Sequence, residues 1–85
     1  MAEIYTLVKY QDSKLDNRVF DTLDGAKQVL LREYTELLKD INNAIKLFPN
    51  DKKLKRYKKY FSEEYAYLHA EDNTHAIWEI FTIQV

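Results

Sequence analysis

Residues 22–48, TLDGAKQVLLREYTELLKDINNAIKLF, decide the fold of this chain. Apolar side chains recur in this stretch at intervals of three or four, which is the period of one face of an α-helix. They are Ala26, Leu30, Tyr34, Leu37, Ile41, Ala44 and Phe48. Thr22 or Asp21 can cap the helix, because either side chain can accept a backbone N–H of the first turn. The pattern predicts a helix from about residue 22 to 47, which Pro49 ends.

A second helix is predicted after the proline, from Asn50 or Asp51 to about Glu63. Its inward face would carry apolar and aromatic side chains at helical spacing, namely Leu54, Tyr57 and Phe61. Its opposite face would carry Lys52, Lys55, Arg56 and Lys59, with Lys53 and Tyr60 at the border. We expect the two helices to form an antiparallel hairpin.

Strands are predicted before the helices. Glu3 to Tyr10 is rich in β-branched and aromatic residues, which is typical of a strand. Gln11 to Asn17 is polar, and we expect a loop there. Arg18 to Phe20 is predicted as a short second strand that pairs with the first.

The C-terminal part predicts a β-hairpin of Tyr65 to Ala70 and His75 to Val85, joined by the turn Glu71-Asp72-Asn73-Thr74. The element order is then β(β)ααββ. We expect an α+β fold with one domain over residues 1–85, in which a small antiparallel sheet of three to four strands packs on a two-helix hairpin. The other face of the sheet would carry several tyrosines and Trp78.

The composition excludes several kinds of site. The chain has no cysteine, so it forms no disulfide and no thiolate metal site, and its single glycine excludes a glycine-rich phosphate loop. Ser13 and Ser62 lack the flanking glycines of a hydrolase nucleophile. No apolar run approaches the roughly 18–20 residues of a membrane span. We therefore expect a soluble, cytoplasmic protein that is not an enzyme, needs no cofactor and binds no membrane.

The charge of the chain is polarised. The net charge is −1, but residues 52–59 contain six basic residues, so the remainder carries −7. The basic stretch with Tyr60 would suit phosphates and stacked bases, or it is a solvated helix face. The acidic loop residues would suit the nucleic-acid groove of a partner, or they are ordinary loop and cap carboxylates. They include Asp12, Asp16, Glu71 and Asp72.

The two histidines, His69 and His75, face each other across the predicted hairpin if it has a three-residue turn. Imidazoles with a nearby carboxylate from Glu71 or Asp72 would suit a transition metal. The sequence offers no third well-spaced ligand, however. We therefore predict no metal site and expect half-exposed strand residues.

In its small size, its lack of cysteine, its many Lys, Tyr, Asn and Ile residues and its α+β layout, the chain resembles small accessory and inhibitor proteins. These are encoded by phages and other mobile elements of Gram-positive bacteria, and anti-CRISPR proteins are among them. The resemblance implies a protein that acts by binding another protein.

We predict a non-enzymatic protein-binding module that inhibits a nucleic-acid-handling host protein by occlusion. A charged patch would steer the encounter, and aromatic residues on the sheet or a helix would anchor the complex. The predicted contact residues are Lys52, Lys53, Lys55, Arg56, Lys59, Tyr60, Trp78, Asp12, Asp16, Glu71 and Asp72. One alternative is a small nucleic-acid-binding protein that uses the basic helix 52–60. Another is a structural homodimer that forms through the open face of the sheet.

Overall fold

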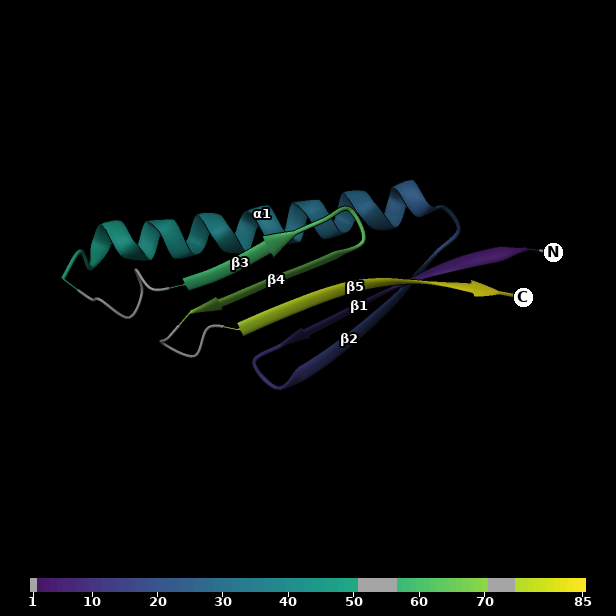
Figure 1. The fold of residues 1–85 in the computed structure, drawn as a ribbon, viewed down its shortest axis with the longest axis horizontal. Coiled ribbons are helices and arrows are strands. Elements are labelled where there is room, and N and C mark those ends of the chain that lie inside the picture. The colour runs from purple at the N-terminus through teal and green to yellow at the C-terminus, as the bar shows by residue number, and fades with distance from the viewer. Residues whose placement is uncertain (1, 51–56, 71–74) are drawn as a thin grey trace.

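The computed structural model describes residues 2–50, 57–70 and 75–85 (Figure 1). Its elements follow the order ββαβββ. They are β1 (Glu3–Gln11), β2 (Lys14–Phe20), α1 (Leu23–Leu47), β3 (Tyr57–Phe61), β4 (Tyr65–Ala70) and β5 (His75–Gln84). The strands form one antiparallel sheet in the order β2-β1-β5-β4-β3. The predicted α+β class is confirmed, but the sheet has five strands instead of three to four.

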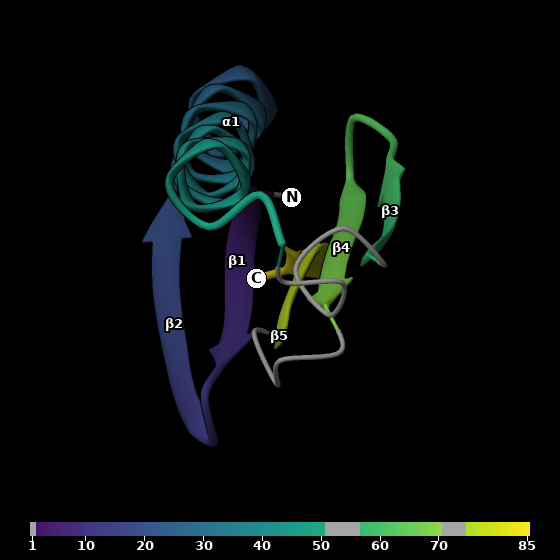
Figure 2. The ribbon, with the colours of Figure 1, turned by 90° about the vertical axis from the view of Figure 1, so that its left-hand side faces the viewer.

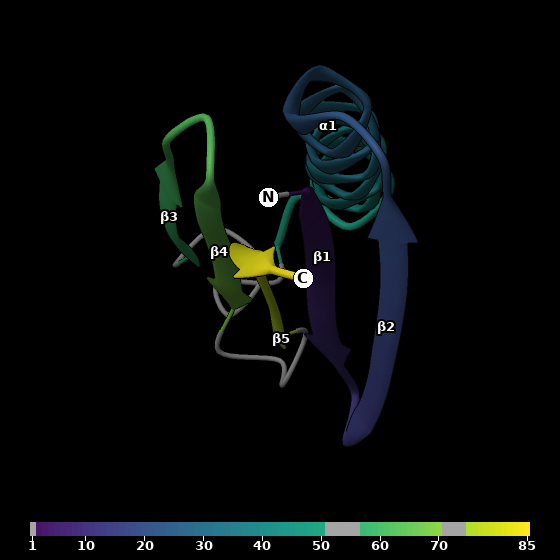
Figure 3. The ribbon, with the colours of Figure 1, turned by 90° about the vertical axis from the view of Figure 1, so that its right-hand side faces the viewer.

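One long helix covers one side of this sheet (Figure 1). The 25 residues of α1 span about 37 Å at ~1.5 Å per residue. Figures 2 and 3 look along the long axis and show α1 over β1 and β2, with β4 and β3 to one side of the helix. In the described residues the second face of the sheet is therefore left without a covering layer. No helix in this part of the chain is long and apolar enough to cross a membrane.

The core lies between α1 and the sheet. Its largest fully buried side chains are Leu7, Leu30, Leu68 and Trp78, one each from β1, α1, β4 and β5. Successive side chains of a strand point to opposite faces, so the burial of these residues fixes which face of each strand meets the helix. The buried side chains of Ala26, Tyr34 and Ile41 continue the apolar stripe along α1, as its spacing predicted.

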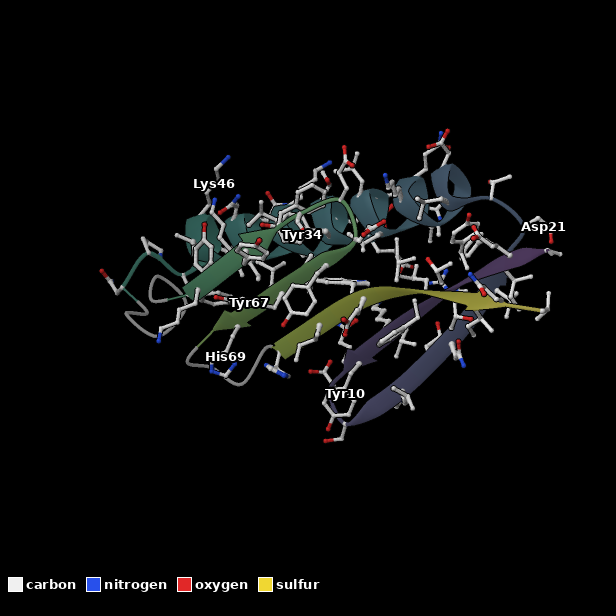
Figure 4. All side chains as sticks on the ribbon, turned by 45° about the vertical axis from the view of Figure 1, so that its right-hand side comes forward. Tyr10, Asp21, Tyr34, Lys46, Tyr67 and His69 are labelled. Atoms are coloured by element: carbon white, nitrogen blue, oxygen red, sulfur yellow. The ribbon has the colours of Figure 1, made fainter. Side chains whose placement is uncertain are left out.

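Trp78 belongs to this core, so its predicted position on the open face of the sheet is wrong. In the sheet it lies between Lys9 and Ala66, whose side chains share its face. The ring of Tyr34 on α1 packs edge-on against it at 6.0 Å between centroids. Figure 4 shows Tyr34 between the helix and the strands. Trp78 is 0% exposed, so it is not part of a contact surface.

The predicted helix over residues 22–47 is confirmed as α1. Thr22 is its N-cap, and the Thr22 hydroxyl accepts a hydrogen bond from the Gly25 N–H at 3.1 Å. A Cβ at Gly25 would lie 3.0 Å from that hydroxyl, which explains why a glycine suits the first turn. At the other end Phe48 N–H bonds to the Ala44 carbonyl, and Pro49 follows.

The prediction of a second helix, and of a two-helix hairpin, is wrong. Residues 51–56 lie outside the described residues, and Tyr57–Phe61 forms strand β3, which pairs with β4. Both an alternating and a helical pattern fit so short an aromatic segment, and pairing with a neighbouring strand decides between them. A turn closes the pair: Ser62 N–H donates to the Tyr65 carbonyl at 2.7 Å, and the Ser62 hydroxyl accepts from Tyr65 N–H at 3.2 Å.

The loop predicted over residues 11–17 is also wrong, because β2 begins at Lys14. Asp12 and Ser13 alone connect β1 to β2, with φ values of 52° and 66°. Two positive φ values are the mark of a type I′ turn, the tightest hairpin connection. This turn could not be predicted from the sequence, because Asp12-Ser13 lacks the glycine usual in such turns and because the edge strand β2 that follows is polar.

Candidate functional site

The side of the sheet that faces away from α1 is apolar across all five strands. Its members alternate with the residues that point into the core, so the strand register places them on one surface. We call this surface the open sheet face. Its apolar members are Ile4, Val8 and Tyr10 of β1, Leu15 and Val19 of β2, Tyr60 of β3, Tyr65 and Tyr67 of β4, and Ile77, Phe81 and Ile83 of β5.

Much of the open sheet face is accessible. Tyr10, Tyr60 and Phe81 are 40%, 50% and 46% exposed. Since a whole aromatic side chain covers about 150–250 Å², these three leave roughly 200–340 Å² uncovered. Leu15, Val19 and Ile83 are also exposed and extend the same surface. An exposed apolar patch of a few hundred Å² is often an interaction site.

Three tyrosines from β3 and β4 form a cluster on this face, which we call the tyrosine cluster. The rings of Tyr60 and Tyr67 are nearly parallel, 6.0 Å apart, and sit at directly opposed positions of the two strands. Tyr65 lies 6.0 Å from Tyr60 and 6.3 Å from Tyr67. Each ring restricts its neighbours, so the cluster presents a large surface that loses little side-chain entropy on binding.

Charge is sparse on the open sheet face. Among the described residues its charged members are Lys58 on β3 and Glu79 on β5. Lys59 belongs to the other face of the same edge strand. Lys58, Lys59 and Tyr60 therefore lie on a strand at the sheet edge, where the sequence predicted a basic helix. The predicted contact residues Lys52, Lys53, Lys55 and Arg56 lie outside the described residues.

Two of the predicted acidic contact residues lie in the described part of the chain. Asp12 and Asp16 line a shallow hollow at the β1–β2 turn together with Lys9 and Lys14. Asp16 also lies 3.4 Å from Arg18, between Oδ2 and Nε. Their charge is thus largely balanced by adjacent cations, and they lie at the far end of the sheet from β3. Glu71 and Asp72 lie outside the described residues.

A histidine pair lies at the end of β4 and β5. His69 and His75 occupy opposed positions, and their Nδ1 atoms are 3.0 Å apart. The rings meet edge to face with 5.1 Å between centroids. Tyr10 of β1 packs edge-on against His75 at 6.2 Å. The predicted juxtaposition of the two histidines is confirmed; Figure 4 labels His69 on β4 and Tyr10 on β1.

The sequence did not reveal a charged centre under α1. The half-buried carboxylate of Glu33 accepts two hydrogen bonds from Arg18 Nη2, at 2.6 and 2.8 Å. It also accepts the indole N–H of Trp78 at 3.3 Å, and Lys9 Nζ lies 3.9 Å away. Lys9 follows Leu7 by two residues in the predicted strand, so the two share a face, and a cation on an inward face favours a carboxylate from the covering layer. That preference could have pointed to Glu33.

Two further contacts fix the helix over β3 and β4. Lys27 Nζ lies 3.1 Å from Glu63 Oε2 at the β3–β4 turn, and this hydrogen bond raises the pKa of the Lys27 ammonium. Burial against Trp78 and Phe61 raises the pKa of the Tyr34 phenol, and Tyr57 adds to the effect. Both contacts attach α1 to the strands β3 and β4, which carry the tyrosine cluster on their other face.

Two hollows on the described surface are small. The hollows at the β1–β2 turn and beside Lys27 hold about 220 Å³ each, below the roughly 300–1,000 Å³ of small-molecule sites. Within the described ranges no three His, Asp or Glu side chains converge on a common point. In comparisons with known protein families, curated proteins and solved structures, no match was found. The open sheet face is therefore the feature from which a function can be argued.

Proposed function

We propose that this chain is a non-enzymatic protein-binding module that docks a protein partner on its open sheet face. The observation that carries the proposal is the tyrosine cluster, which continues into the half-exposed apolar side chains of β1, β2 and β5. Tyrosine and other aromatic residues are enriched at the energetic centres of protein interfaces, and charged residues are depleted there.

The partner we propose presents an apolar patch bordered by carboxylates. The open sheet face supplies the apolar contact, and Glu79 and Lys58 are its charged members among the described residues. Lys58 and Lys59 make the β3 edge basic, and the four basic residues of 52–56 directly precede that strand in the sequence. An acidic rim on the partner would complement this edge and speed the encounter.

An inhibitory role against a nucleic-acid-handling protein stays a prediction. Occlusion needs only a surface that covers the partner's working site, and a two-layer module with one apolar face suits that task. The same face would serve equally in any other protein complex.

The experiment starts by identifying the partner through a photo-cross-linking residue placed at Tyr60, with Phe48 as the matched control position. Phe48 is an exposed aromatic residue at the end of α1, outside the sheet. The cross-linked partner is then purified and titrated with the intact chain, Tyr60→Ala and Phe48→Ala. We expect Tyr60→Ala to weaken binding at least tenfold, about 1.4 kcal/mol, and Phe48→Ala to leave the affinity within a factor of two.

Equal affinities for the two variants would contradict the proposal. So would a stable dimer of the isolated chain that hides the open sheet face, because a second copy would then be its occupant. Light scattering after size exclusion separates the 10.2 kDa chain from a dimer of twice that mass. We expect the monomer at micromolar concentration.

A second candidate function is binding of single-stranded nucleic acid. Exposed aromatic rings on a sheet, next to basic residues, are a common stacking platform, and Tyr60 adjoins Lys58 and Lys59. Fluorescence anisotropy with labelled single strands tests it. Binding that weakens with salt, with a slope of about 0.7 per phosphate contacted, and that Tyr60→Ala abolishes would favour this function over the first.

A further inference from the structure

The backbone geometry brings His69 and His75 unusually close. Ile80 N–H donates to the Glu64 carbonyl at 2.9 Å, so the even-numbered residues of β5 turn their backbone groups toward β4. His75 therefore faces His69 in a non-hydrogen-bonded pair, the position at which cross-strand side chains lie closest. In the described residues, the hydrogen-bond partner of each Nδ1 is the other imidazole.

This separation matches that of two ligands on one metal ion. Metal–nitrogen distances of about 2.0–2.1 Å place two imidazole nitrogens about 2.8–3.0 Å apart at a right angle, and about 3.3–3.4 Å apart at a tetrahedral angle. The observed 3.0 Å is the length of a hydrogen bond between the two rings, and it falls close to the first of these ranges, so the two nitrogens need little movement to occupy adjacent corners of a square-planar or octahedral site. Copper(II) and nickel(II) favour such geometries with nitrogen ligands, whereas zinc favours the tetrahedron.

We propose that His69 and His75 form a two-histidine site that binds copper(II) or nickel(II) through their Nδ1 atoms. In the metal-free chain one Nδ1–H lies between the two nitrogens as a shared hydrogen bond. The metal takes the place of that proton, which moves to Nε2 of the same ring, so two neutral imidazoles bind without net proton release. Water fills the remaining coordination positions.

The surroundings set the strength and selectivity of the site. Tyr10 packs against the edge of His75 and restricts that ring. Lys58 lies opposite His69 on the neighbouring strand, and its positive charge lowers the affinity for any cation. Two ligands held at a fixed distance give a site of modest affinity that ranks copper(II) above nickel(II) and zinc(II), in the order usual for nitrogen ligands.

The test is calorimetric titration of the full-length chain with copper(II), nickel(II) or zinc(II) chloride, repeated with His69→Ala and His75→Ala. Both side chains are at least partly accessible, and circular dichroism checks that each variant folds. We expect one ion per chain, copper(II) bound most tightly, and at least a tenfold loss of affinity in each variant. Lys58→Ala should tighten binding, because it removes the nearby positive charge.

Nitrogen-detected NMR of the imidazoles supplies a readout that a structural role alone would not change. With diamagnetic zinc(II) in excess, the Nδ1 resonances of both histidines should shift, and both Nε2 atoms should carry a proton, whereas only one of them does in the metal-free chain. Coordination through Nε2, binding that survives in His69→Ala, or no binding up to millimolar metal would each overturn the proposal. This test is independent of any protein partner.

Discussion

Glu33 joins α1 to the strands β2 and β5, and its replacement should destabilise the fold. The Glu33 carboxylate accepts two hydrogen bonds from Arg18 and one from Trp78, and its side chain is only 16% exposed. A hydrogen bond to a charged group is worth about 1.5–3 kcal/mol, and an unsatisfied buried donor costs about 1–3 kcal/mol. Because Arg18 is one-third exposed and can turn to water, we discount its share and expect Glu33→Ala to lose about 2–4 kcal/mol.

The assay is urea unfolding followed by the fluorescence of Trp78, which is the single tryptophan and is fully buried. Glu33→Gln keeps the shape and loses the charge, so we expect about half the effect of the alanine variant. Glu36→Ala, an exposed carboxylate one turn further along α1, is the matched control and should change stability by less than about 0.5 kcal/mol. A Glu33→Ala loss no larger than the control's would refute the reasoning.

Substitutions at three further positions test other parts of the fold. Ser13→Gly should stabilise the chain by about 0.5–1 kcal/mol in urea unfolding, because glycine adopts the positive φ of 66° without strain; Ser13→Ala should give no gain. Thr22→Ala should lose about 1 kcal/mol with the N-cap hydrogen bond, and recovery in Thr22→Ser would tie the loss to the hydroxyl. The pKa of Tyr34 is raised in the folded state, so its contribution is present below the unfolded pKa of about 10 and is lost as the pH rises through the folded pKa. The stability of Tyr34→Phe relative to the intact chain should therefore increase between pH 8 and pH 11, and a constant difference would show that the phenol does not titrate with unfolding.

The elements with a strong period could be predicted from the sequence. α1 is a helix of 25 residues with an apolar stripe and a capping threonine, and β1, β4 and β5 are rich in β-branched and aromatic residues. The strand ends of the C-terminal hairpin were predicted to within a residue, and so was the opposition of His69 and His75. These elements depend on local pattern, which a sequence displays directly.

The edge strands could not be predicted in the same way. β2 is polar and starts after a two-residue turn without glycine, so its sequence is typical of a loop. β3 is five residues long, and its strand conformation depends on pairing with β4 and on packing of Phe61 against Tyr34. Both depend on tertiary contacts that local propensity does not contain.

The composition of the candidate site differs from the prediction because these two segments are strands. A basic helix became, in its described part, a basic edge strand, which places Tyr60 beside Tyr65 and Tyr67. Trp78, expected as an exposed anchor, is instead the central core residue. Several tyrosines were expected on the open side of the sheet, and Tyr65 and Tyr67 lie there. Tyr60 was expected at the border of the second helix and instead lies on the same side of the sheet, because it belongs to β3 and pairs with Tyr67.

The most direct test of the central claim is covalent footprinting of the chain with and without its purified partner. If the open sheet face binds the partner, the labelling of Tyr60, Phe81 and Leu15 falls on complex formation, while Leu47 and Phe48 at the end of α1 keep theirs. Protection confined to Leu47 and Phe48, with the sheet residues labelled as in the free chain, would show that the partner binds elsewhere and that the open sheet face is not the contact surface.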